Sequence, residues 1–250
     1  MKALIVGVAN ERSLAWAIAQ ELKRLGFDLA FTYLDERMEK RVRPLAESLG
    51  SQIIEPLDVG QDAQVERLFQ NLKQKWGRLD ALVHSVAFAN REDLEGRFVD
   101  TTREGFRMAM DVSAFSLVAL AKAAEPLMSE NGGAIVTLTY HGSQKVVPNY
   151  NVMGVAKAAL ESSVRYLASD LGPKKIRVNA VSAGAVKTLA AAGIRDFRDK
   201  LTETQNKAPL RENIDQNDVG ALGAFLCAPQ SKHITGSIMY VDSGLHILGA

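Results

Sequence analysis

The chain has 250 residues, of which 47% are hydrophobic and 24% charged, so it can bury a substantial core and is not a disordered protein. Its 30 basic and 29 acidic residues give a formal net charge of +1, which offers no global attraction to nucleic acid or to an anionic membrane. The single cysteine, Cys227, cannot form an internal disulfide and has no metal-site spacing around it, which predicts a buried structural thiol. No apolar run reaches the length of a membrane span and no signal peptide is evident, so we expect a soluble, cytoplasmic protein.

Seven short apolar or β-branched runs alternate with longer helical patterns. The runs are KALIVGV from Lys2, LAFTY from Leu29, QIIEPLD from Gln52, ALVHSVA from Ala81, AIVTLTY from Ala134, IRVNAVS from Ile176 and SIMYVDSG from Ser237. Continuous apolarity suits strands that are buried on both faces, and the intervening lengths suit crossover helices. The pattern predicts an α/β fold with a single Rossmann-like, doubly wound parallel sheet of about seven strands. The sequence has no internal repeat and no linker-like segment, so residues 1–250 are expected to form one domain.

The alternation is interrupted after the sixth run. Residues 187–210 have the pattern of short helical pieces before the regular pattern resumes. An insertion at the carboxyl end of a strand lies where open α/β sheets bind ligands. We expect a short helical lid over the substrate, and a packed helical pair is the alternative.

The first predicted strand ends at Gly7, and a helical pattern begins near Leu14. A glycine at this turn lets the backbone approach a pyrophosphate, and the helix N-terminus supplies N–H donors. Ser13 and Ala15 stand where a full GxGxxG motif would have its later small residues. An ordinary strand-to-helix turn therefore remains the alternative to a dinucleotide site.

Acidic residues follow the second and third predicted strands. Asp35 and Glu36 precede Arg37, and an acidic side chain there would accept from the adenosine ribose 2′-hydroxyl, which favours NADH over NADPH. Asp58 follows the third strand, where its carboxylate could accept from the adenine amino group. The alternative role, capping the next helix, suits Asp62 better.

The fourth predicted strand ends in small residues. Ser85 and Ala87 would let a cofactor pass close to the backbone. His84 is a lone histidine in an apolar setting, which is more typical of a satisfied structural residue than of a catalyst.

Tyr150 and Lys157 stand seven residues apart in a helical pattern from about 150 to 171. Pro148 blocks an earlier start, and Asn149 can cap the helix. Seven residues turn an ideal helix by about 700° and advance it by about 10 Å, so the pair shares a face. The lysine could hold a cofactor ribose while its charge lowers the pKa of the phenol. Two surface residues on an amphipathic helix are the alternative.

Taken together, these motifs resemble the short-chain dehydrogenase/reductase superfamily and, within it, the bacterial NADH-dependent enoyl-acyl-carrier-protein reductases. The resemblance runs from about Lys2 to Gly249. It is carried by GVANERSLAWAIA, AFTY, HSVAFA, TREGFRMAMDVSAFSL, TLTYHG, PNYNVMGVAKAALE, RVNAVSAG, TLAAAGIRDF and YVDSG.

The spacing of the tyrosine and the lysine departs from that of the ketone reductases in this superfamily. Their tyrosine stands four residues before the lysine, where this chain has Met153, and their strand serine is replaced here by Thr137 and Thr139. The resemblance therefore implies reduction of a carbon–carbon double bond. A reductase acting on a ketone and a non-catalytic NAD-binding sensor are the alternatives.

The resemblance also implies roles for individual residues. NADH would deliver hydride to C3 of a trans-2-enoyl thioester, Tyr150 would hydrogen-bond the enolate oxygen, Lys157 would bind the ribose, and Tyr140 would be a second active-site tyrosine. The implied cofactor contacts are Gly7, Ser13, Leu14, Asp58, Val59, Ser85, Lys157, Val186 and Thr188. The implied substrate contacts are Ala89, Tyr140, Tyr150, Met153, Ala190 and Phe197. The residues imply no metal.

The implied partner is an acyl-carrier protein bearing the enoyl thioester. Lys187, Arg195 and Arg198 are candidates for docking this acidic protein, and a solvated helix face is the alternative. A homotetramer is implied, with interfaces on the predicted helices 114–128 and 150–171.

Overall fold

The computed structural model describes residues 1–188 and 197–249. Seven parallel strands form one sheet in the order β3-β2-β1-β4-β5-β6-β7. They are β1 (Lys2–Val6), β2 (Asp28–Tyr33), β3 (Ile53–Pro56), β4 (Ala81–His84), β5 (Gly133–Thr139), β6 (Ile176–Ala183) and β7 (Ile238–Val241). Each of the seven predicted strands is present, and the predicted fold class is confirmed.

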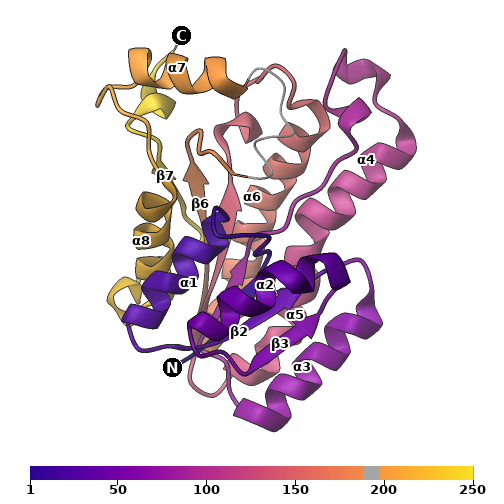
Figure 1. The fold of residues 1–250 in the computed structure, drawn as a ribbon, viewed down its shortest axis with the longest axis vertical. Coiled ribbons are helices and arrows are strands. Elements are labelled where there is room, and N and C mark those ends of the chain that lie inside the picture. The colour runs from indigo at the N-terminus through magenta and orange to yellow at the C-terminus, as the bar shows by residue number, and fades with distance from the viewer. Residues whose placement is uncertain (189–196, 250) are drawn as a thin grey trace.

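Helices cover both faces of the sheet (Figure 1). One face carries α1 (Leu14–Arg24), α2 (Glu36–Ser48) and α8 (Gln216–Cys227). The other carries α3 (Asp62–Trp76), α5 (Ser116–Met128) and α6 (Asn151–Leu171). Neighbouring residues of β1 separate the two cores, since Ala3 and Ile5 pack on the first face and Leu4 and Val6 on the second.

The strand order reverses beside β1, which lies between β2 and β4. In open α/β sheets, ligands bind at the carboxyl ends of the strands at such a reversal. The order of this sheet therefore places a ligand site next to Gly7 and Ser85, the residues that directly follow β1 and β4.

The remaining helices lie near the carboxyl ends of the strands. Helix α4 (Arg103–Met110) runs into α5 through a π-helical turn, Asp111–Phe115. Helix α7 (Phe197–Lys207) lies within the predicted lid and is seen beyond the ends of β6 and β7 in Figure 1. The middle of the predicted lid, including Ala190, lies outside the described residues, as do the side chains at 197–200 and 203.

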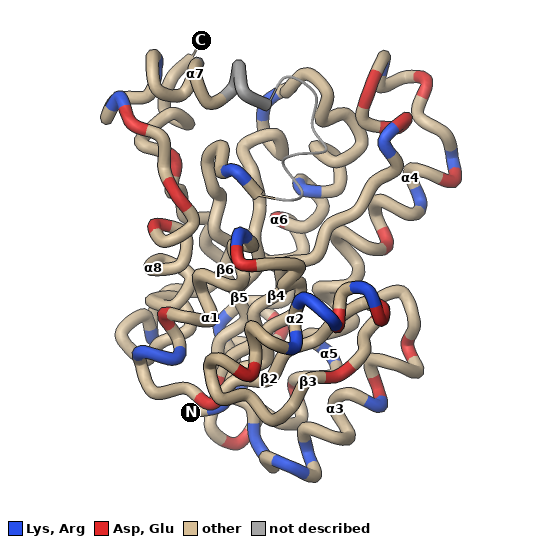
Figure 2. Tube along the Cα trace, in the orientation of Figure 1, with Lys and Arg blue, Asp and Glu red and all other residues tan. Residues whose placement is uncertain are grey.

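Charges of both signs are interspersed along the chain in Figure 2, as the net charge of +1 leads one to expect. In the described part of the chain, no helix is long and apolar enough to span a membrane.

Candidate functional site

Gly7 occupies a backbone position that only glycine accommodates easily. Its φ is +104°, and a Cβ at this position would lie 2.1 Å from the carbonyl oxygen of Ser85. The two strand ends are also tied together, because Ser85 N–H donates to Val6 O at 2.9 Å. The chain after β1 therefore lies directly against the chain after β4, at the strand reversal.

Ser13 closes the turn between β1 and α1. Its hydroxyl oxygen accepts from the backbone N–H groups of Ala9 and Asn10 at 3.0 and 3.1 Å. Ser13 is the N-cap residue of α1, yet its side chain caps no N–H of the helix, which begins at Leu14. A short turn that leads into a helix without a side-chain cap is a suitable place for a phosphate.

The ends of β3 and β6 supply further predicted cofactor contacts. Asp58 Oδ1 accepts from Gly60 N–H at 3.0 Å, which leaves the second carboxylate oxygen for another donor. Val59 and Val186 are buried, and Thr188 N–H donates to Val186 O at 2.8 Å. All of these residues lie at the same edge of the sheet as Gly7, and together they fit a bound dinucleotide.

The carboxylates near β2 and β3 differ in part from the prediction. Asp35 caps α2, since its Oδ1 accepts from Met38 N–H at 2.8 Å. The prediction that Asp62 caps α3 is wrong, because Gln61 holds the N-cap position and Asp62 lies in the first turn. A carboxylate in the first turn stabilises the helix dipole without a capping hydrogen bond.

Tyr140 and Tyr150 meet beside an apolar cluster. Their rings lie edge to face, with centroids 5.1 Å apart. Tyr150, Met153 and Ala156 form the buried part of the cluster, and Ala89, Leu94, Met110, Tyr140 and Val147 pack against it. The structure thus brings together the predicted substrate contacts Ala89, Tyr140, Tyr150 and Met153. Leu94, Met110, Val147 and Ala156 had no distinguishing sequence signal, because ordinary apolar residues occur throughout the chain.

A strained turn fixes the position of Tyr150. Asn149 has φ of +60° and Asn151 has φ of +27°, so Tyr150 lies between two residues in the left-handed region. The prediction that Asn149 caps α6 is therefore wrong: Tyr150 itself is the N-cap residue, and it precedes the helix. Gly142 allows the ring to pack closely, since a Cβ there would lie 2.7 Å from Tyr150 Cδ1.

The protonation of Tyr150 also differs from the prediction. Burial raises the pKa of its phenol well above the ordinary value of 10.0, and the charges of Tyr140 and Glu161 act in the same direction. The expectation of a phenol with a lowered pKa is therefore wrong. Tyr150 holds its proton at neutral pH and can donate a hydrogen bond from Oη.

Lys157 lies in the interior of the protein. Its Nζ donates to Leu138 O at 2.8 Å. Burial lowers its pKa from 10.5 to about 8, while the charge of Glu161 opposes that shift. The ammonium form therefore still predominates at neutral pH, and its remaining N–H donors are available for a ligand.

His84 is a structural residue, as predicted. Its ring nitrogens lie 2.8 Å from Thr137 Oγ1 and 2.9 Å from Ser116 Oγ. Burial and the charge of Lys157 lower its pKa to about 3, so the ring is neutral. The π-helical turn also supports this region, because the Ser113 hydroxyl bonds both the N–H and the carbonyl of Phe88.

Two anchoring residues were missed in the sequence. Glu161 is buried and accepts hydrogen bonds from Thr139 and Ser143. Asn151 Nδ2 donates to the carbonyl oxygens of Glu95 and Gly96, which ties the start of α6 to the segment after β4. The position of Glu161 four residues after Lys157, on the same buried helix face, could have identified it.

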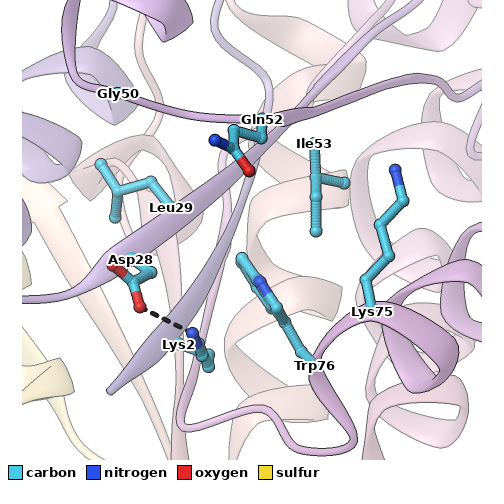
Figure 3. A pocket seen from close by; sticks show the side chains of 8 residues that line it. All are labelled: Lys2, Asp28, Leu29, Gly50, Gln52, Ile53, Lys75 and Trp76. Carbon is cyan, nitrogen blue, oxygen red and sulfur yellow. Dashed lines mark hydrogen bonds and ion pairs between the residues drawn. The ribbon is translucent and has the colours of Figure 1, made fainter.

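The described structure has two notable pockets. The larger, about 490 Å³, lies at the amino ends of β1 and β2, where Lys2 and Trp76 line it (Figure 3). Its charged groups are satisfied within the protein, since Lys2 Nζ lies 2.6 Å from Asp28 and 5.4 Å from the Trp76 ring centroid. The smaller, about 280 Å³, is lined by Tyr140, Ala185 and Thr204 among others. We assign the chemistry to the carboxyl edge despite the smaller volume, because the strand reversal, the buried Tyr150 and the adjoining Tyr140 lie there.

Comparisons with known proteins identify the family. The family model described as Enoyl-(Acyl carrier protein) reductase matches residues 7–246. The chain is 51% identical to the NADH-dependent enoyl-[acyl-carrier-protein] reductase FabI of Rickettsia prowazekii, over 100% of this chain and 95% of that protein.

Solved structures extend the comparison to the fold. The Anaplasma phagocytophilum reductase in complex with NAD is 47% identical, with a TM-score of 0.94 over 100% of this chain and 93% of that one. The Bacillus cereus enzyme with NADP⁺ and an indole naphthyridinone is 50% identical, with a TM-score of 0.97 over 100% and 97%. With a match over nearly the full length in sequence and in fold, the chain belongs to the enoyl-(acyl carrier protein) reductase family.

Proposed function

We propose that the chain reduces the trans-2 double bond of an enoyl thioester on acyl-carrier protein, with NADH as the electron donor, in fatty acid elongation. The observation that carries this function is the protonated Tyr150, held beside Tyr140 at the edge of an apolar cluster. The apolar cluster suits an acyl chain, and the phenol suits an oxygen on which negative charge develops.

The cofactor would lie across the carboxyl ends of the strands. Gly7, Ser13, Leu14, Asp58, Val59, Ser85, Val186 and Thr188 would hold it there. Lys157 would donate from its ammonium group to the nicotinamide ribose hydroxyls. When bound, NADH supplies the hydride that adds to C3 of the enoyl group.

Tyr150 would donate its hydrogen bond to the thioester oxygen. Hydride addition to C3 places negative charge on that oxygen, two carbons away, and a neutral phenol stabilises it without a charged residue in the apolar site. Tyr140 would fix the Tyr150 ring by its edge contact and, with Ala89 and Met153, would contact the acyl chain. Protonation at C2 completes the saturated product.

A direct assay tests this function. We expect NADH oxidation with crotonyl thioester, weaker oxidation of NADPH, and none with acetoacetyl thioester. Tyr150→Phe should lower kcat by about 10²-fold, the usual effect of removing one oxyanion donor. Tyr166→Phe is the matched control, since this tyrosine lies on the same helix and is 73% exposed. Turnover of the ketone in place of the enoyl substrate would contradict the proposal.

The partner and the assembly follow from the same proposal. The acyl-carrier protein would dock near the mouth of the site, where Lys187 is exposed, whereas Arg195 and the side chain of Arg198 lie outside the described residues. We further propose a cytoplasmic homotetramer, supported by the exposed apolar residues Phe115, near the start of α5, and Val155, on α6. Light scattering of the purified protein tests the tetramer, and a monomeric mass would contradict it.

A further inference from the structure

A buried carboxylate without a role in the proposed chemistry joins the strand, the turn and the helix that carry the site. Glu161 is 5% exposed and follows Lys157 by four residues on α6. Its Oε1 accepts from Thr139 Oγ1 at 2.7 Å and from Ser143 Oγ at 2.5 Å. Thr139 is the last residue of β5, and Ser143 ends the short turn that follows Tyr140.

We propose that Glu161 is a positioning residue for the reaction: it holds the Tyr140-bearing turn against α6 and places its carboxylate one helical turn after Lys157. The inference rests on the proposed function of Tyr150 and Lys157. A carboxylate is costly to bury unless it is hydrogen-bonded and near a positive charge, and Glu161 meets both conditions. The hydroxyl donors and the nearby lysine therefore explain how Glu161 can be buried.

The hydrogen bonds of Glu161 determine where the two tyrosines meet. Thr139 directly precedes Tyr140, so the bond from its hydroxyl fixes the end of β5 relative to α6. The bond from Ser143 holds the 141–143 turn, and the backbone of Gly142 in that turn packs against the Tyr150 ring. Loss of both bonds would free the turn that sets the edge contact between the rings.

The charge of Glu161 acts on Lys157 and Tyr150 in the same sense. Glu161 on α6 is the charged group that raises the pKa of Lys157, whereas His84 on β4 is neutral and has its own pKa lowered by Lys157. Strand β5 contributes uncharged groups here: the hydroxyls of Thr137 and Thr139, which bond His84 and Glu161, and the carbonyl oxygen of Leu138, which accepts from Lys157. Because burial lowers the pKa of Lys157 to about 8 even with Glu161 present, removal of that charge would lower it further.

Two substitutions separate the charge from the hydrogen bonds. Glu161→Gln removes the charge and keeps an oxygen acceptor of the same reach. Glu161→Asp keeps the charge but is too short to reach both hydroxyls. Ser143→Ala is the matched control, since it removes one hydrogen bond and leaves the carboxylate in place. Each variant is assayed for the NADH dissociation constant and for kcat/KM with crotonyl thioester, from pH ~6 to ~10.

NADH affinity and kcat/KM should both be lost at alkaline pH. For Glu161→Gln we expect the midpoint of this loss to lie about one pH unit lower than in the wild type, the size expected for removal of a carboxylate charge ~6 Å away along a helix. Glu161→Asp and Ser143→Ala should keep the wild-type midpoint and lose about tenfold in kcat/KM through misplaced tyrosines. Thermal unfolding of each variant verifies that it is folded.

The inference would be overturned if Glu161→Gln lost NADH affinity and kcat/KM at the same pH as the wild type. Full activity in both Glu161→Asp and Ser143→Ala would also overturn it. If Glu161→Gln does not fold, the loss of kcat/KM in the other two variants still decides the positioning role. Failure of the wild-type protein to reduce crotonyl thioester would refute the proposed function instead. The NADH titration is independent of that outcome because it needs no substrate.

Discussion

Gly7→Ala is the substitution whose effect follows most directly from the geometry of the site. The new Cβ would lie 2.1 Å from Ser85 O and 2.5 Å from its carbonyl carbon, and the residue would keep a φ of +104°. A carbon and an oxygen need roughly 3.2 Å, close to the shortest weak C–H···O contacts, so the two strand ends must move apart by about 1 Å. The substitution therefore strains the backbone and displaces the cofactor-binding turn together.

The magnitude can be separated into two parts with a control. Gly26→Ala introduces a Cβ at a φ of +82° with nothing within 4 Å, so it should cost only the left-handed penalty, about 1 kcal/mol. Gly7→Ala should add the backbone displacement, for a total loss of about 3 kcal/mol. A ~1 Å displacement of a positioning element also costs about 10²-fold in function.

Two measurements at one protein concentration test this prediction. Urea unfolding gives the loss of stability in each variant, and NADH titration followed by fluorescence gives the loss of affinity. We expect Gly26→Ala to bind NADH as the wild type does and Gly7→Ala to bind it at least about tenfold more weakly. Equal losses of stability and equal NADH affinity in the two variants would refute the reasoning from the Ser85 contact.

Other predictions follow from burial and hydrogen bonding. Because the pKa of Lys157 is lowered from 10.5 to about 8, NADH affinity should fall as the pH rises through about 8. In the unfolded chain Lys157 keeps its proton up to about pH 10.5, so this residue should make the free energy of unfolding rise between about pH 8 and pH 10.5. Urea unfolding at several pH values, in the wild type and in Lys157→Met, tests the sign of this effect. The same pH dependence in both proteins would contradict it. Asn151→Ala should raise KM for crotonyl thioester several-fold by releasing the segment near Glu95, and an unchanged KM would exclude that anchor. Cys227 is buried with its pKa raised to about 12, so it should react with a thiol reagent only after unfolding.

Local patterns were sufficient for much of the fold. Continuous apolar runs identified the seven strands because both faces of a parallel sheet are buried. His84 and Cys227 each stand in an apolar stretch with no partner motif nearby in the sequence, and this correctly indicated structural side chains. Gly7 was identified by its place after the first strand, but its contact with Ser85 depends on strand order, which local sequence does not encode.

The amino-acid sequence by itself determined the sheet, the strand ends that carry the site, and the spacing of Tyr150 and Lys157. Tertiary structure alone decided the protonation of these two side chains, because their burial depends on residues far apart in the chain. The segment after β4, the turn after β5 and the start of α6 enclose Tyr150 and keep its phenol protonated, which reverses the pKa shift expected from the lysine alone. The link from Glu161 to Thr139 and Ser143 likewise joins residues 22 and 18 positions apart, and it exists only once α6 packs on β5.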